Sequence, residues 1–235
     1  MICLVDERIS EKCERSLLKR GFHVIKMPRS KKLGDAVASH PDMLLFYHGG
    51  RLITSSEYCE SFPYIFSDIR ERSKTSLTFT DDTQEPVYPK DAVFNALCIG
   101  EYIFFKEDTV SEAIKDYALD NAITSVPVNQ GYPACTALVF GNSAITSDSG
   151  MARALSKVGI NVTVISNGDI SLPPYEYGFI GGASGVLGNT VYFLGNPDSH
   201  RDGKKIRSAI EGAGYRICAL SDEPLTDLGR IIFIE

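Results

Sequence analysis

The feature that most constrains the fold is a segment that recurs along the chain. Residues 135–166 contain an apolar strand, the turn Gly141–Asn142, a second strand, a helix with one apolar face, Gly159 and a third strand. Gly-Asn is favourable hairpin chemistry, and glycine after a helix suits a left-handed cap. Whether this unit is repeated decides how the fold is interpreted.

The same order of elements recurs at 183–222, 94–128 and, more loosely, 40–82. In residues 94–128 we expect Asp108 to cap the helix and Asn121 to replace the terminal glycine, because asparagine tolerates positive φ. The unit at 40–82 has a longer helix. These segments predict four complete ββαβ units.

The two ends of the chain together supply a fifth unit. Residues 1–28 lack the first strand of the hairpin, and residues 229–235 form a strand with no helix after it. We therefore predict that Ile231–Ile234 pairs with Ile2–Val5. The predicted fold is α/β: one domain over residues 1–235, a five-fold pseudosymmetric ββαβ propeller with outer helices and a central channel. Closing the ring removes exposed sheet edges; an ordinary open α/β sheet is the alternative.

Composition restricts the classes of partner. The formal charge is −6 and no basic stripe is present, so nucleic acid is not expected to bind. No apolar run reaches the length of a membrane span. The six cysteines form neither C-x-x-C pairs nor zinc-like spacings with histidine. We expect a reduced, cytoplasmic protein with no metal and no cofactor, and the sequence does not indicate an oligomeric state.

Three stretches carry a resemblance to a known fold: "QGYPAC", "GFIGGASG" and "LSDEPLTDLGRIIFI". Together with the five-unit ring, they resemble a bacterial family with the pentein fold, the scaffold of arginine deiminases, dimethylarginine dimethylaminohydrolases and amidinotransferases. The resemblance implies a hydrolase or transferase scaffold. The chain departs from the pattern at Ile180, Ala183 and Ala134, where those enzymes show an acidic residue, an aspartate and a histidine. The departures argue against arginine-type chemistry in its usual form.

Residues just before each inner strand should meet near the axis of such a ring. Cys135 is the candidate nucleophile, since a thiolate attacks electrophilic carbon once its pKa is lowered or a base assists. The candidate substrate-binding residues are Asp42, Asp227, Ser184, Gln130, Tyr132, Asn95, Asp91 and His48. Backbone N–H groups of Gly181–Gly182 are candidates for stabilising an oxyanion.

These residues predict hydrolysis or transfer at a guanidine-, amidine- or amide-type carbon of a small, cationic ligand. The alternative is a non-catalytic module of the same fold that binds a small molecule or a protein. In that case Cys135 is a small core residue and the aspartates cap turns. His48 suits a hairpin end better than a general base. We expect His23, His40 and His200 on the surface. The loops 81–91 and 171–182 either cover the channel mouth or pack on the outer surface.

Overall fold

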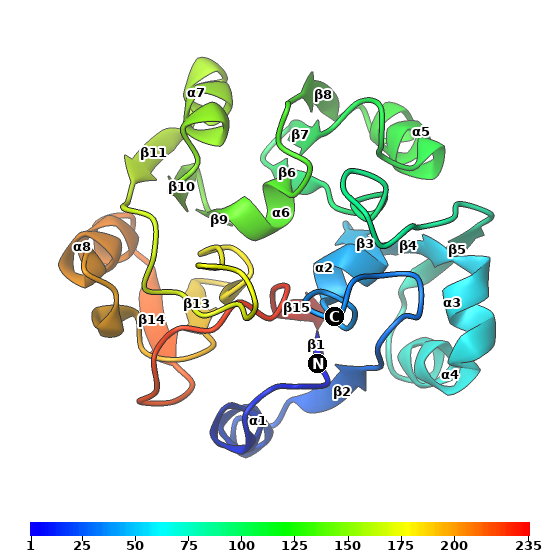
Figure 1. Ribbon diagram of the computed structural model, residues 1–235, viewed down its shortest axis with the longest axis horizontal. Coiled ribbons are helices and arrows are strands. Elements are labelled where there is room, and N and C mark those ends of the chain that lie inside the picture. Colours follow the sequence, from blue (N-terminus) through cyan, green and yellow to red (C-terminus); the bar gives the residue numbers. More distant parts are fainter.

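Five three-stranded sheets form a ring in the computed structural model, which describes residues 1–235 (Figure 1). In each sheet the middle strand is antiparallel to one neighbour and parallel to the other. The sheets are β15 (Ile232–Ile234), β1 (Ile2–Asp6) and β2 (His23–Met27); β3 (Leu45–His48), β4 (Arg51–Ser55) and β5 (Ser76–Thr80); β6 (Leu97–Ile99), β7 (Tyr102–Phe105) and β8 (Thr124–Pro127); β9 (Ala137–Phe140), β10 (Ser143–Thr146) and β11 (Asn161–Val164); β12 (Ser184–Leu187), β13 (Thr190–Phe193) and β14 (Arg216–Ala219).

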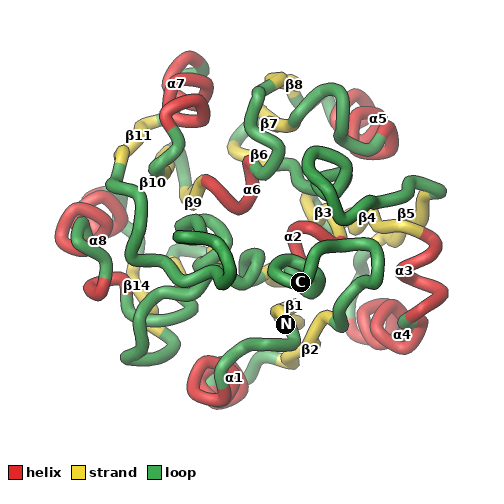
Figure 2. Tube along the Cα trace, viewed as in Figure 1, coloured by secondary structure: helices red, strands yellow, loops and turns green.

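The longer helices lie at the periphery and two one-turn helices lie near the centre (Figures 1 and 2). The outer helices are α1 (Glu11–Lys19), α3 (Ser56–Ser61), α4 (Pro63–Arg72), α5 (Glu112–Asp120), α7 (Ser149–Lys157) and α8 (Gly203–Gly212). The central ones are α2 (Pro41–Leu44) and α6 (Pro133–Thr136), and a short 3-10 helix, η1, spans Pro197–Ser199. None of the helices combines the length and apolar character that crossing a membrane requires.

The chain ends close the ring as the sequence predicts. β15 pairs antiparallel with β1, with Ile2 opposite Ile234 and Leu4 opposite Ile232. Ile2, Leu4 and Ile234 are all buried. The pairing covers the edge that β1 would otherwise expose.

Each hydrophobic core cluster combines residues of at least two units. Met151 and Leu155 on α7 pack in one cluster with Leu97 and Phe104 of the preceding sheet. The other four clusters likewise combine residues of adjacent sheets. A unit therefore buries its apolar face only in the presence of its neighbours.

Several local predictions hold and two are wrong. Asp148 caps α7 by accepting from Met151 N at 2.7 Å, and Gly159 after that helix has a φ of 82°. The cap of α5 is Ser111 and not Asp108, because a turn after β7 delays the start of the helix to Glu112.

The end of α5 also differs from the prediction. Ala122, with a φ of 53°, takes the left-handed conformation expected of Asn121. The Asn121 side chain donates to Tyr117 O at 2.8 Å instead, which terminates the helix one residue before the left-handed position.

Candidate functional site

A closed circle of hydrogen bonds surrounds the axis just before the inner strands; we call it the axial collar. Its bonds run from Asp42 N to Gly229 O (3.1 Å), from Asn95 Nδ2 to Asp42 O (3.2 Å), from Ala134 N to Asn95 Oδ1 (2.8 Å), from Gly182 N to Cys135 O (2.9 Å) and from Arg230 N to Gly182 O (2.9 Å). Every unit contributes at least one residue. Asn95 differs from the others because its side chain, not its backbone, bridges two units.

Proline and glycine shape the collar. Pro41 and Pro133 begin the one-turn helices α2 and α6, where proline's fixed φ is already helical. A Cβ on Gly181 would overlap the carbonyl oxygens of Ala134 and Cys135. The Gly182 N–H donates to Cys135 O, so it is engaged in the collar and is not the free oxyanion donor that the sequence suggested.

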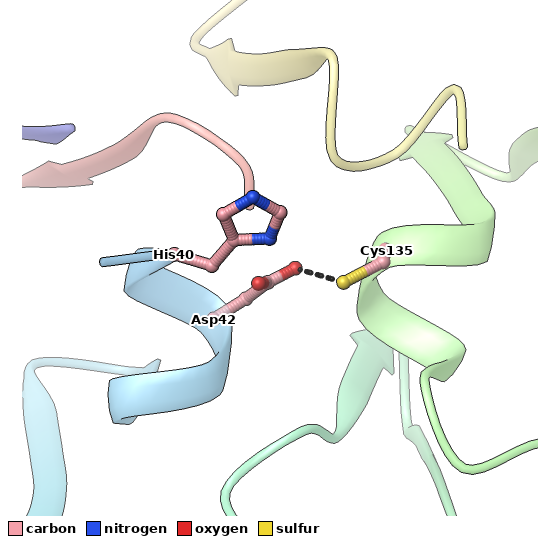
Figure 3. A group of neighbouring side chains, drawn as sticks. All are labelled: His40, Asp42 and Cys135. Carbon is pink, nitrogen blue, oxygen red and sulfur yellow. Dashed lines mark hydrogen bonds between the residues drawn. The ribbon is translucent and has the colours of Figure 1, made fainter. Parts of the chain in front are cut away.

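Cys135 lies on α6 and faces a carboxylate on α2 (Figure 3). Its thiol donates to Asp42 Oδ2 at 2.9 Å, and its sulfur accepts from Asn95 Nδ2 at 3.3 Å. Burial, followed by the negative charges of Asp42 and Asp227, raises the pKa of Cys135 well above its usual value. The resting residue is therefore a thiol with a proton acceptor in contact.

Two buried carboxyls accompany this thiol. Burial raises the pKa of Asp42 to about 6 and that of Asp227 to about 7. Asp227 accepts from Phe179 N at 2.8 Å and from Gly229 N at 3.1 Å, whereas Asp42 Oδ1 is buried without a hydrogen-bond partner. Both groups ionise near neutral pH, and a bound cation would stabilise their charged forms.

His40 is a site residue that the sequence analysis placed wrongly on the surface. It is 1% exposed, with Nε2 3.8 Å from Asp6 Oδ2 and Nδ1 3.9 Å from Asp227 Oδ1. Neither ring nitrogen has a hydrogen-bond partner, and burial lowers the pKa of His40 to about 3. The sequence contains one signal for this position: His40 precedes Pro41 as Tyr132 precedes Pro133, so the two residues occupy equivalent positions in their units.

The prediction for His200 is also wrong. His200 is buried, and its Nδ1 accepts from Asp202 N at 3.0 Å at the start of α8. This contact gives it a local structural role away from the axis.

Three of the central groups are close enough to share one metal ion. The ligating atoms of His40, Asp42 and Cys135 lie within 4.8 Å of one another. Imidazole, carboxylate and thiolate are the donors that zinc takes in proteins. Sequence motifs for metal sites require ligands at short, fixed spacings, so they do not detect this set. Asp42 and Cys135 are 93 residues apart in sequence.

A pocket of about 430 Å³ reaches Cys135 from one face of the ring. Its lining contains three carboxylates, five aromatic rings and no lysine or arginine. The lining residues are Val37, His40, Met43, Tyr88, Asp91, Tyr132, Cys135, Leu172, Tyr175, Glu176, Tyr177, Phe179 and Asp227. Both long loops, 81–91 and 171–182, contribute to it, so they cover this mouth of the ring.

The remaining predicted residues fall into two groups. Tyr132 lines the pocket and donates to Asp91 Oδ2 at 2.6 Å. Ser184, Gln130 and His48 do not line it. Ser184 donates to the carbonyls of Ile180 and Gly181, and Gln130 donates to Asp148 Oδ2 at 2.9 Å.

His48 lies at the hairpin end of β3, where Nδ1 is 2.9 Å from Tyr117 Oη. It lines a separate pocket of about 250 Å³ together with Arg230. The collar residues Asp42 and Ala134 also line this second pocket, which places it on the other side of the collar from the Cys135 pocket.

Solved structures with this architecture are enzymes with the pentein fold. A dimethylarginine dimethylaminohydrolase mutant from Pseudomonas aeruginosa, complexed with citrulline, is 10% identical with a TM-score of 0.56, covering 94% of this chain and 92% of that one. The agmatine deiminase of C. jejuni is 9% identical with a TM-score of 0.55, covering 94% and 87%.

An amidinotransferase from Microseira wollei, from the saxitoxin biosynthetic pathway, is 10% identical with a TM-score of 0.55, covering 94% and 88%. At these identities the likeness shows the fold. No match is found among curated protein sequences. A family model does match residues 4–232, and the chain therefore belongs to the family of unknown function DUF6873, with the pentein fold.

Proposed function

We propose that the protein is a cysteine-dependent hydrolase or transferase that acts on a guanidine-, amidine- or amide-type carbon of a small cationic molecule. One observation carries the proposal: Cys135 Sγ lies 2.9 Å from Asp42 Oδ2 at the floor of a pocket lined by carboxylates and without a basic residue other than the neutral His40. The names of the structural neighbours, an aminohydrolase, a deiminase and an amidinotransferase, support this reaction class.

Substrate binding would activate the thiol. Burial, followed by the negative charges of Asp42 and Asp227, raises the pKa of Cys135 and keeps it protonated in the free protein. A cation held between Asp42, Asp227 and the sulfur would reverse this balance, because an adjacent positive charge favours the thiolate. The nucleophile would then form only when a substrate of the right charge is bound.

The proposed steps conserve atoms and charge. Cys135 gives its proton to Asp42 Oδ2, the thiolate attacks the cationic carbon, and the π electron pair moves onto a substrate nitrogen. Asp42 returns the proton to the leaving nitrogen, the C–N bond breaks, and a covalent thioether-type adduct remains. Water in a hydrolase, or an acceptor amine in a transferase, then attacks the adduct carbon and gives a proton through Asp42 to the sulfur; the C–S bond breaks, the product leaves and the Cys135 thiol is restored.

Neighbouring residues would hold these groups in place. Asn95 contacts both the Cys135 sulfur and the backbone of Asp42, so it would keep nucleophile and acceptor in register. Asp227 would hold the positive charge of the substrate, and neutral His40 would offer Nδ1 as an acceptor beside it. Tyr132 and Asp91 would contact the rest of the ligand.

A matched pair of alkylating reagents tests the nucleophile. Chloroacetamidine is cationic and chloroacetamide is its neutral analogue, so their relative rates report whether the site attracts positive charge. We expect Cys135 to react at least ~10-fold faster with the amidine, equivalent to about 1.4 kcal/mol, measured by peptide mass spectrometry. The half-buried Cys59 should show no such preference.

The Asp227→Asn variant should lose most of the preference at Cys135. Failure of Cys135 to react with either reagent in the folded protein, while Cys59 reacts, would reject the nucleophile. Turnover is then tested by release of ammonia or amine from a panel of guanidines and amidines, with Cys135→Ala as the inactive control.

A non-catalytic binding module is the second candidate. It is favoured by the two carboxylates that keep Cys135 in the thiol form. This function predicts that cationic ligands stabilise Cys135→Ala as much as the wild type, with no release of amine by either protein.

A cytoplasmic location remains part of the proposal. All six cysteines are unpaired. Free thiols are typical of reducing compartments.

A further inference from the structure

Asp91 takes no part in the bond-making and bond-breaking steps proposed above. It is 5% exposed, lines the Cys135 pocket and accepts from Tyr132 Oη at 2.6 Å through Oδ2. Its other oxygen, Oδ1, is buried without a hydrogen-bond partner. A buried carboxylate oxygen without a partner is unfavourable, so this position is suited to receive a donor from a ligand.

Aromatic rings adjoin the same carboxylate. Tyr132, which holds Asp91, packs against Tyr88 with ring centroids 5.4 Å apart. The Tyr88 ring packs against Gly131, where a Cβ would overlap it, so the ring position depends on glycine at residue 131. Aromatic faces next to a carboxylate bind ammonium groups through cation–π and charge-assisted contacts.

The pocket has a floor and a rim. Cys135 and Asp227 are nearly inaccessible, whereas Tyr88 and Tyr175 are 48% and 61% exposed. Asp91 is buried, and its partner Tyr132 packs against the exposed Tyr88, so Asp91 is linked to the rim through these two rings. A ligand whose reacting carbon sits at Cys135 would therefore extend its other end past Asp91.

The charges of the pocket lining indicate that the ligand carries no carboxylate. Asp91, Glu176 and Asp227 are acidic, and neither lysine nor arginine lines the pocket. His40 is buried, and its low pKa keeps it neutral. A carboxylate on the ligand would meet like charges and have no ion-pair partner, which makes binding unfavourable.

We propose that Asp91, together with Tyr88 and Tyr132, forms a second cation site, and that the ligand is a carboxylate-free molecule with two positive ends. A guanidine or amidine lies at Cys135 and a primary or secondary amine lies at Asp91, with an apolar chain between them. The assignment of the first end rests on the proposed function. The assignment of the second rests on Asp91 and its aromatic neighbours alone.

Calorimetric titration of the Cys135→Ala protein with three matched probes tests the inference. Agmatine carries a guanidine and an amine, butylguanidine lacks the amine, and arginine adds a carboxylate. We expect agmatine to bind at least ~10-fold more tightly than either of the others, one charge-assisted contact being enough for such a factor.

Variants of one loop localise the effect. In the Cys135→Ala protein, the further substitution Asp91→Asn should lower the affinity for agmatine to that for butylguanidine. The affinity for butylguanidine itself should change by no more than about twofold. Glu85→Gln is the control, because Glu85 is an exposed acid of the same loop that pairs with Lys90 and does not line the pocket. It should change neither affinity.

The outcomes separate the two proposals. Arginine binding as tightly as agmatine, or butylguanidine equal to agmatine, overturns the second cation site and leaves the proposed function standing. If 1,4-diaminobutane binds in an Asp91-dependent way while no guanidine binds, the second site stands and the proposed function fails. If no probe binds at millimolar concentration, both are overturned.

Discussion

At the scale of single residues, the site is defined by acidic groups whose pKa values are raised by burial. Asp42 and Asp227 have pKa values of about 6 and about 7 because both are removed from water. Cys135 is kept as a thiol by the same surroundings. The empty site thus holds its protons until a cation arrives, and both ligand binding and stability should depend on pH.

The first prediction concerns binding. Only ionised carboxyls attract a cation, so the affinity for butylguanidine should rise with pH through the pKa values of about 6 and about 7 and level off above them. Binding should release protons in the same range. Calorimetry in buffers of different ionisation enthalpy, with a chelator present, measures both. An affinity independent of pH between those limits would contradict the role of the two aspartates.

The second prediction concerns stability and uses Asp227→Asn. Folding raises the pKa of Asp227 from 3.8 to about 7, so the folded state binds the extra proton and loses stability as pH rises through about 7. His40 shifts the opposite way, from 6.5 to about 3, and its contribution is complete above its unfolded value. His40 is present in both proteins, so its contribution cancels in the difference between Asp227→Asn and the wild type, and the test spans pH ~4 to ~8, which includes both the unfolded and the folded pKa of Asp227.

In that range, the unfolding free energy of Asp227→Asn should gain on the wild type with rising pH, by about 1–4 kcal/mol. Urea unfolding at several pH values measures it. Parallel curves for the two proteins would show that Asp227 does not titrate as described.

At the scale of elements, the collar depends on close backbone approach. Gly181 lies against the carbonyls of Ala134, Cys135 and Ala137, and a methyl group there must push α6 outward. We expect Gly181→Ala to cost about 2–4 kcal/mol and to slow alkylation of Cys135.

Gly212 in α8 is the matched control for this substitution. Nothing lies within 4 Å of a Cβ at that position, so Gly212→Ala should be neutral or stabilising by about 0.5–1 kcal/mol. Urea unfolding of both variants compares them. Equal effects would mean that the close approach at Gly181 is unimportant.

Asn95 is the one collar member that acts through its side chain. Replacing it with alanine leaves Ala134 N and Asp42 O without a partner, at a cost of about 2–4 kcal/mol. The exposed contact of Asn142 with Gly159 O provides a control, Asn142→Ala, with an expected loss below about 1 kcal/mol. Thermal unfolding distinguishes them, and a smaller loss for Asn95→Ala than for Asn142→Ala would contradict the collar's importance.

At the scale of the whole molecule, stability depends on closure of the ring. Ile234 is fully buried and β15 covers the edge of β1. Deleting Ile232–Ile234 should destabilise the protein by several kcal/mol, about 2–4 for each large core residue lost, and promote association through the exposed edge. Urea unfolding and size-exclusion chromatography measure the two effects.

Circular permutation supplies the control for that deletion. Joining the adjacent termini through a short linker and opening the connecting segment between β11 and β12 at Asn167–Gly168 keeps all five sheets. The permuted protein should stay folded and within about 2 kcal/mol of the parent. Collapse of the permuted protein and tolerance of the deletion would together show that closure contributes little.

Much of the architecture could be predicted because its signals are local. These signals are turn glycines such as Gly141, apolar helix faces such as Met151 with Leu155, and alternation along strands. Each acts within a few residues, and its recurrence in several units makes it easier to recognise. The orphan strand at 232–234 likewise had one available partner, the unpaired edge at the start of the chain.

Sequence alone thus determined the five-unit ring and the candidate nucleophile Cys135 with Asp42 beside the axis. Only the tertiary structure decided which polar residues face the pocket. In the folded protein His40 is buried in the site and Gly182 N–H donates within the axial collar. The side chains of Ser184, Gln130 and His48 make hydrogen bonds outside the Cys135 pocket. The physical reason is distance: periodicity reports the face of one element, whereas the axis joins positions as far apart as Asp42 and Gly229, whose contact no local pattern encodes.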